Sequence, residues 1–300
     1  MEKGRTKGFL VASITAFDKE DHLCPEMQHT LMEKNVEDGA VGFLIGGSSA
    51  ECPLLTHEER IQCFETAASF SKRESVSLMA NIASISTAEA IEYARKAKEL
   101  HFDSIISTVP YYYKFGMKGI ASFFSEIREK VDLPLYLYNF PGNTGIEIDI
   151  DHPDIERIIK DGTLDGIKQT SLNLYQLERI KDKNPDLIVY GGYDEVYLGA
   201  RILGADGAIG STFNFTLPLF TEIEKQYKEK NIDEAQKLQN KANNIMYALV
   251  KCSLFPSIKY ILKEQGIDCG KCRKPFPELT EDQKKYILNV VKENMIFKEI

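Results

Sequence analysis

The sequence has no long apolar run. No uninterrupted apolar stretch among its 300 residues approaches the ~18 residues that a membrane-spanning helix requires. The run at residues 9–17 follows basic residues, as the core of a signal peptide would, but Ser13 and Thr15 interrupt it and the acidic segment 18–21 follows without a cleavage motif. We therefore expect a first core strand there, no membrane partner and a cytoplasmic location.

An excess of basic charge is also missing. The chain carries 37 Lys plus Arg against 45 Asp plus Glu, a net charge of -8. Proteins that bind nucleic acid or anionic membranes present a basic face, so this balance argues against both kinds of partner. A small anionic substrate needs only a few local hydrogen-bond donors, so the negative net charge does not exclude one.

Metal, disulfide and nucleotide signals are weak. No two of the five histidines have a metal-ligand helix spacing, and the six cysteines are scattered as in proteins with reduced thiols. Cys269 and Cys272 have CxxC spacing but no second pair nearby, which favours a fortuitous loop. The glycine-rich segment 204–210 matches neither a P-loop nor a dinucleotide fingerprint. We expect no metal and no nucleotide cofactor.

Apolar runs alternate with helix-period segments along most of the chain. The expected strands are mostly continuous apolar runs, the pattern of strands buried on both faces. They cover residues 8–16, 41–46, 76–81, 104–109, 135–138, 164–167, 187–190 and 207–209. The expected helices between them cover residues 27–36, 57–69, 87–101, 117–131, 155–160, 172–183 and 194–203. This alternation predicts the α/β class, as a parallel (β/α)₈ TIM barrel.

After Asn214 the strand pattern stops. Helical segments are expected at residues 217–230, 233–249, 256–265 and 281–297. No Pro/Gly/Ser-rich linker separates them from the barrel. The interpretation is a catalytic barrel over residues 1–215 and a C-terminal helical bundle, residues 216–300, packed on it.

A lysine lies at the carboxyl end of the sixth expected strand. Catalytic side chains in such barrels come from strand carboxyl ends and the loops that follow, and Lys168 directly follows the run 164–167. Desolvation disfavours the ammonium form of a lysine, and a neutral amine is what attack on a carbonyl requires to form a Schiff base. The alternative is an ordinary surface lysine.

Other strand ends supply groups that would help such a lysine. Ser48 and Ser49 follow two glycines, where hydroxyls and close backbone N–H groups would bind a carboxylate, as in an α-keto acid. Tyr138 can give or take a proton, and a relay through Ser49 and a tyrosine from the run 111–113 could carry it onward. An ordinary turn and tyrosines of the core or an interface remain the alternatives.

With these features, the chain resembles the dihydrodipicolinate synthase / N-acetylneuraminate lyase superfamily. The segments similar to its signatures occur in the same order, at residues 47–51 with 55–60, 138–145, 166–168 and 204–207. The resemblance implies a class I pyruvate-dependent aldolase, usually a homotetramer, with no cofactor beyond a covalent imine. It implies that Lys168 forms the imine, Tyr138 is the acid/base, Ser48 and Ser49 bind the carboxylate, and Tyr112 is a relay lent by the neighbouring subunit.

Within the superfamily the lyase branch is the more similar, over residues 168–176, 184–187, 192–195, 210–212 and 272–276. This implies that the polyhydroxyl arm of a sugar acid contacts Thr170, Gly192, Asp194, Glu195 and Ser211. Two positions depart from the pattern. Asn143 stands where synthases carry an arginine and sialic acid lyases an apolar residue, and Ala50 replaces a glycine, which would be costly if position 50 needed a positive φ.

The implied reaction is the reversible cleavage of N-acetylneuraminic acid, a sialic acid, to N-acetylmannosamine and pyruvate, a step of carbohydrate metabolism. One alternative is an aldolase for another 2-keto-3-deoxy sugar acid, with the difference expected at Asn143 and at Asp194 and Glu195. An alternative of another class is a non-catalytic pyruvate-binding protein, against which the presence of Lys168, Tyr138 and both serines argues.

Overall fold

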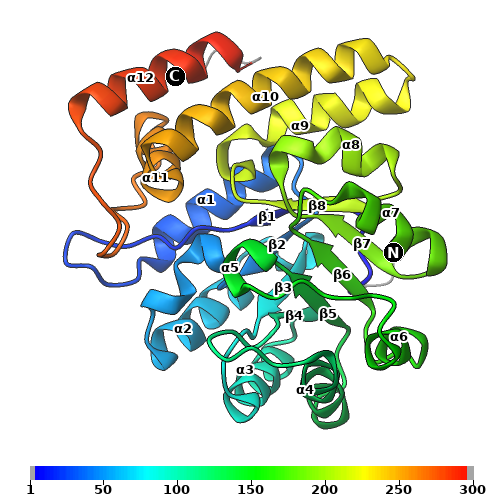
Figure 1. The fold of residues 1–300 in the computed structure, drawn as a ribbon. Helices are drawn as coiled ribbons and strands as arrows, with labels where there is room; N and C mark the ends of the chain where they lie inside the picture. The colour runs from blue at the N-terminus through cyan, green and yellow to red at the C-terminus, as the bar shows by residue number, and fades with distance from the viewer. Residues whose placement is uncertain (1–3, 296–300) are drawn as a thin grey trace.

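A closed parallel barrel forms the centre of the molecule (Figure 1). The computed structural model describes residues 4–295. Each strand pairs with its neighbours in sequence order, and β1 pairs with β8 to close the barrel. The strands are β1 (Gly8–Ala12), β2 (Gly42–Ile45), β3 (Ser77–Asn81), β4 (Ser104–Thr108), β5 (Leu135–Asn139), β6 (Gly166–Gln169), β7 (Ile188–Gly191) and β8 (Gly207–Gly210). The predicted TIM barrel is confirmed.

Helices surround the barrel, as expected for strands whose outer faces must also be buried. They are α1 (Pro25–Glu37), α2 (His57–Ala68), α3 (Thr87–Glu99), α4 (Met117–Lys130), α5 (Pro141–Thr144), α6 (Pro153–Lys160), α7 (Leu174–Lys183), α8 (Tyr197–Ile202) and α9 (Phe213–Lys228). Short 3-10 turns are η1 (Ser48–Ala50), η2 (Cys52–Leu54), η3 (Arg73–Ser75) and η4 (Asp194–Val196).

The first strand is shorter than its apolar run suggested. β1 ends at Ala12 rather than at residue 16 because side chains bind the backbone that follows. The amide of Ile14 donates to Asn214 Oδ1 over 3.4 Å and that of Ala16 donates to Gln28 Oε1 over 3.0 Å. Residues 13–16 therefore form a buried loop.

The N-terminal segment crosses the amino-terminal end of the barrel. Tyr136 and Tyr190 are buried in the barrel interior, and their hydroxyls donate to the carbonyl oxygens of Gly4 and Thr6 respectively. This leaves the opposite end, where the strand carboxyl termini lie, as the end that can receive a substrate.

The C-terminal extension consists of α10 (Ile232–Cys252), α11 (Leu254–Glu264) and α12 (Glu281–Asn294). α10 packs against α9 and α12, and these helices lie side by side along one edge of the barrel (Figure 1). α9 begins at Phe213, not at residue 217, because Asn214 is buried in its first turn and donates to the carbonyl of Ala12 over 2.9 Å.

The predicted boundary between barrel and extension, at residues 215 and 216, lies inside α9, which also contacts β1 and α1. This division into two domains stays a prediction. The expected helix at residues 281–297 ends at Asn294, and residues 296 and 297 lie outside the described residues.

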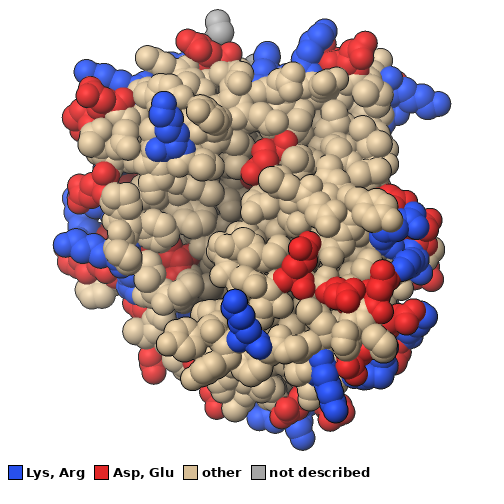
Figure 2. Space-filling view, viewed as in Figure 1, with Lys and Arg blue, Asp and Glu red and all other residues tan. Residues whose placement is uncertain are grey.

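On the face seen in Figure 2, acidic and basic residues are interspersed along the edge, and uncharged residues cover most of the middle. Within residues 4–295, no single helix is long and apolar enough to cross a membrane; α10 and α11 pass that test only jointly, as a pair bent by 114°. The same residues contain no group of three or more His, Cys, Asp and Glu side chains that could hold a metal ion.

Candidate active site

Lys168 and Tyr138 lie side by side inside the barrel. They are register partners on β6 and β5, so both side chains point the same way, into the interior. Both residues are 4% exposed, and the lysine Nζ lies 4.1 Å from the centroid of the tyrosine ring. Among residues 4–295, no carboxylate lies within ion-pair distance of Lys168. Its amine is therefore not held in an ion pair and can react with a carbonyl.

Polar side chains on the outer faces of the same strands hold these two strand ends in place. Asn139 Nδ2 donates to Gln169 Oε1 over 2.9 Å, and Gln169 Nε2 donates to Gln176 Oε1 over 2.6 Å. Gln176, on α7, in turn donates to the carbonyl of Ile148 over 2.8 Å. This buried network fixes the register that brings the lysine and the tyrosine together.

The loop after β2 carries the two predicted carboxylate binders. Ser48 is half-buried and Ser49 is buried in η1, and the Ser49 hydroxyl lies 2.6 Å from that of Ser211, after β8. The structure thus brings together two predicted residues that are far apart in sequence. Ala50 lies inside the same turn, and the positive φ, 61°, falls on Glu51 instead. The alanine at position 50 therefore carries no left-handed strain.

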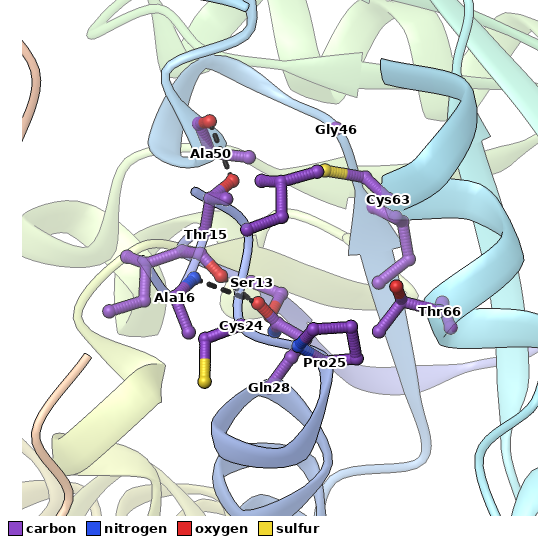
Figure 3. Close-up of a pocket in the computed structure, with 14 residues that line it drawn as sticks. Ser13, Thr15, Ala16, Cys24, Pro25, Gln28, Gly46, Ala50, Cys63 and Thr66 are labelled. Atoms are coloured by element: carbon purple, nitrogen blue, oxygen red, sulfur yellow. Dashed lines mark hydrogen bonds between the residues drawn. The ribbon is translucent and has the colours of Figure 1, made fainter. Parts of the chain in front are cut away.

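A small cavity of about 20 Å³ lies behind this loop (Figure 3). Thr15, Cys24, Gln28 and Cys63 are among its lining residues. The volume suits about one water molecule. Burial raises the pKa of the Cys63 thiol to about 12, so this thiol is neutral near pH 7. The cavity adjoins the loop at Gly46 and Ala50 and is too small for a sugar acid.

Thr170 and Gly192 contact one another beside the lysine strand. A Cβ on Gly192 would lie 1.8 Å from Thr170 Oγ1, so only glycine fits there. The Thr170 hydroxyl and Glu195 Oε2 are buried and have no hydrogen-bond partner among the described residues. Burial also raises the pKa of Glu195. Unpaired buried polar atoms are costly, and here they are available to a polar ligand.

Asp194 is buried at the carboxyl end of β7. Its Oδ2 accepts hydrogen bonds from the amide and the hydroxyl of Thr212, over 3.0 and 2.6 Å. Burial raises the pKa of Asp194 to about 6, while the Thr212 bonds and the nearby Lys168 charge oppose the shift. Gln239, from α10, donates to the carbonyl of Asp194 over 3.0 Å. The C-terminal extension therefore supports this side of the site.

Two predicted site residues are exposed in the single chain. Tyr112 is 82% exposed and has a φ of 79°, a left-handed conformation that is strained for a bulky residue. Its ring packs edge-on against Tyr113, with the ring centroids 5.2 Å apart. Asn143 is exposed on α5, whose Gly142 approaches the hydroxyl of Tyr193.

Comparison with known proteins identifies the family. A profile of the dihydrodipicolinate synthetase family matches residues 5–294. The chain belongs to this family. It is 34% identical over 277 residues to the N-acetylneuraminate lyase of Escherichia coli K12, which covers 92% of each chain. The predicted family and the predicted class of enzyme, a class I aldolase or lyase, are confirmed.

Solved structures agree with this assignment. The structure of CdNal from Clostridium difficile in complex with mannosamine is 31% identical, with a TM-score of 0.92 over 97% of this chain and 99% of that one. N-acetylneuraminate lyase from Fusobacterium nucleatum is 29% identical, with a TM-score of 0.90 over 97% and 100% of the two chains.

Several residues that shape the candidate site were not predicted from the sequence. Thr212 and Gln239 hold Asp194, and Phe140 stacks on the Tyr138 ring at a centroid distance of 5.5 Å. Gln239 lies 45 positions beyond Asp194 in a helix of mixed polarity, so no local pattern marks it. Phe140 was visible only as part of a family signature.

Asp194→Asn tests the electrostatics of the site. The carboxyl reference pKa is 3.8 and the native value is about 6, so the native state binds more protons between these values. The Asp194 contribution to stability is thus greatest below this window and is lost as the pH rises through it, by about 3 kcal/mol.

We expect the free energy of unfolding of the wild type, relative to that of Asp194→Asn, to fall by that amount between about pH 4 and about pH 7. Urea unfolding of both proteins across this range measures it. Parallel pH profiles for the two proteins would contradict the burial argument.

Proposed function

We propose that this chain is an N-acetylneuraminate lyase, which reversibly cleaves N-acetylneuraminic acid to N-acetylmannosamine and pyruvate. The observation that carries the proposal is the buried amine of Lys168 beside Tyr138, free of any carboxylate partner among the described residues. The names of the relatives from E. coli and F. nucleatum support the choice of substrate.

The reaction starts at the keto carbon of the open-chain sugar acid. The amine of Lys168 attacks this carbon, Tyr138 gives a proton to the oxygen that leaves as water, and a protonated imine forms that accepts electrons from the bond to be broken. Ser48 and Ser49 bind the substrate carboxylate through their hydroxyls and the backbone amides of their turn. No metal is needed, because the imine itself is the electron sink.

Proton transfer then drives the cleavage. Tyr138, which gave its phenol proton to the oxygen that left as water, now acts as the base through Ser49 and the substrate carboxylate. It removes the proton of the C4 hydroxyl, and the C3–C4 bond breaks. N-acetylmannosamine leaves as the aldehyde, and the electron pair of the broken bond forms an enamine on Lys168. Protonation of the enamine at C3 and hydrolysis of the imine release pyruvate and restore the amine.

The polyhydroxyl arm would bind on the side of β6, β7 and β8. The unpaired Thr170 hydroxyl and Glu195 Oε2, the space beside Gly192, and Ser211 provide donors and acceptors there. Asp194 contributes through its carboxylate, which Thr212 orients. Asn143, Asp194 and Glu195 are the positions that would distinguish N-acetylneuraminic acid from another 2-keto-3-deoxy sugar acid.

We further propose a homotetramer in which Tyr112 completes the site of a neighbouring copy. Three features support this: the exposed ring, its strained backbone, and the adjoining exposed side chains of Tyr113 and Phe115. Strain of this kind persists at functional sites when surrounding structure holds it. We also propose a cytoplasmic enzyme of carbohydrate metabolism, in line with its six free cysteines.

The first test is pyruvate release from N-acetylneuraminic acid, followed by a coupled lactate dehydrogenase assay. We expect steady release by the wild type and a loss of at least about 1,000-fold in Lys168→Ala, because no other group can form the imine. Lys259→Ala is not a suitable control because that lysine is paired with Glu51. Lys160 is exposed and pairs with Glu156 on α6, so Lys160→Ala is the control and should retain full activity.

Release by Lys168→Ala at the wild-type rate would contradict the mechanism. Release by neither protein, with pyruvate still trapped on Lys168 by borohydride, would reject the sialic acid substrate and favour another 2-keto-3-deoxy acid. Absence of both release and trapping would favour a non-catalytic protein.

Subunit complementation tests the role of Tyr112. Tyr112→Phe and Lys168→Ala should each be impaired, because one lacks the proton relay and the other the imine. Co-expressed in one assembly, they should regain activity, because a site with Lys168 intact can receive an intact Tyr112 from the other chain. Activity no higher than the sum of the two separate variants would contradict a relay lent between copies.

A further inference from the structure

Glu51 stands out in the loop that carries the two serines. It directly follows η1, has a φ of 61°, and its side chain is 0% exposed. A left-handed conformation is unfavourable for a glutamate, and a buried carboxylate is unfavourable without a partner. Both features persist only if other groups hold this residue in place.

Those groups come from the C-terminal extension. Lys259, on α11, is also buried, and its Nζ lies 2.8 Å from Glu51 Oε1. The same amine donates to the carbonyl of Lys271 over 3.0 Å and lies 4.3 Å from the centroid of the Phe17 ring. The backbone amide of Arg273 donates to Glu51 Oε2 over 2.7 Å. The glutamate is thus bound by two groups that lie more than 200 positions later in the chain.

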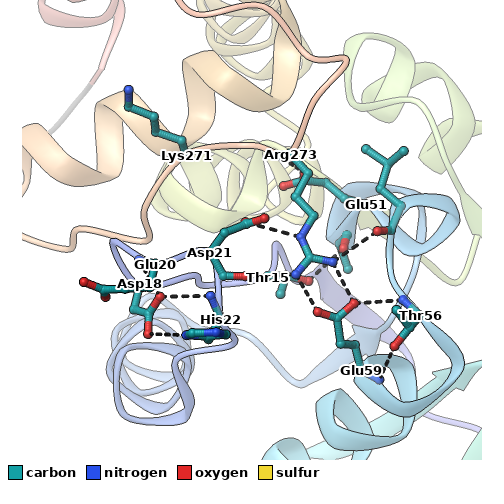
Figure 4. A network of polar contacts seen from close by, with 12 residues as sticks. Thr15, Asp18, Glu20, Asp21, His22, Glu51, Thr56, Glu59, Lys271 and Arg273 are labelled. Carbon is teal, nitrogen blue, oxygen red and sulfur yellow. Dashed lines mark hydrogen bonds and ion pairs between the residues drawn. The ribbon is translucent and has the colours of Figure 1, made fainter.

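The Arg273 side chain binds residues of the turn after β2 and of α2 (Figure 4). Its guanidinium forms two hydrogen bonds with Glu59, at 2.6 and 2.5 Å, and donates to the carbonyl of Leu54 over 3.1 Å. It also contacts Asp21, and the amide of Phe17 donates to the carbonyl of Cys269 over 3.1 Å. The segment 266–280 therefore joins the loop after β1 to the turns after β2.

Two further hydrogen bonds hold the serine turn. The hydroxyl of Thr15 donates to the carbonyl of Ala50 over 2.7 Å, and Asn81 donates to the carbonyl of Gly46 over 2.7 Å. The turn that carries Ser48 and Ser49 is thus fixed at its beginning, at Ala50 and at Glu51. The side chain of Thr15 is buried, so its hydroxyl is committed to this contact.

We propose that Glu51 and Lys259, with Arg273, are positioning residues for carboxylate recognition: the C-terminal segment holds the Ser48–Ser49 turn in the geometry that binds the keto acid. The helical extension is then part of the substrate-binding machinery, not only a cover for the barrel. The inference rests on the proposed function, since it assigns these residues to the carboxylate end of that same site.

The test uses the concentration of pyruvate that gives half-maximal borohydride trapping on the full-length enzyme. Glu51→Gln keeps the shape of the side chain but removes its charge, and Lys259→Met keeps the length of the chain but removes the cation. We expect each to raise the half-saturating concentration at least tenfold, with the maximal extent of trapping retained at saturating pyruvate. Lys160→Ala, which removes only an exposed pair with Glu156 on α6, should stay within twofold of the wild type.

Thr15→Val and Thr15→Ser provide a second test that does not disturb a buried charge. Valine removes the hydroxyl that binds Ala50, whereas serine retains it. We expect Thr15→Val to raise the half-saturating pyruvate concentration about as much as Glu51→Gln does. Thr15→Ser should keep this concentration near the wild-type value. This pair keeps the proposal falsifiable if Lys259→Met fails to fold.

Unchanged half-saturation in both Glu51→Gln and Thr15→Val, with losses only in thermal stability or in the amount of folded enzyme, would overturn the proposal and leave a purely structural role. If the wild type itself traps no pyruvate, the imine mechanism fails first. If the wild type traps pyruvate and the folded variants have the same half-saturating concentration as the wild type, only the positioning role is overturned and the imine mechanism stands.

Discussion

The site depends on the burial of a lysine that has no carboxylate partner among residues 4–295. Two lysines of this part of the chain are almost completely buried, and their surroundings differ. Lys259 is paired with Glu51, as buried charges usually are, whereas Lys168 lies against the face of the Tyr138 ring. The paired lysine is committed to holding structure, and the unpaired one can react with a carbonyl. The register between β5 and β6 places Lys168, the proposed imine lysine, beside Tyr138, its proposed acid/base.

The remainder of the structure serves to hold this arrangement. The N-terminal segment closes one end of the barrel over Tyr136 and Tyr190, and the network around Gln169 fixes the strands on their outer face. At the opposite end, the extension reaches the site at two places: Gln239 supports Asp194, and α11 with the segment after it supports Glu51. Barrel and extension therefore act as one unit at the site.

The strands of the barrel and the candidate residues at their ends could be predicted from the sequence, because local sequence patterns indicate both. Buried parallel strands appear as short apolar runs, and the strand-end rule singled out Lys168, Tyr138 and Ser49 before any contact was known. The limits of β1 and α9 were missed because buried side chains, such as Asn214, satisfy backbone groups that a local pattern assigns to a strand or a loop.

Contacts between distant segments could not be predicted. Nothing near Glu51 indicates that its partner lies at position 259, and Gln239 has no feature that separates it from a surface glutamine. Tyr112 illustrates the opposite case: its predicted role involves another copy, so the isolated chain leaves it exposed. Its strained backbone was not visible in the sequence.

The most direct test of the central claim is to locate the covalent adduct. The enzyme is reduced with borohydride in the presence of pyruvate, digested, and its peptides are mapped by mass spectrometry. We expect a reduced pyruvate adduct on Lys168 and none on the equally buried Lys259. An adduct on a different lysine, or an unmodified Lys168 at saturating pyruvate, would contradict the proposed imine mechanism.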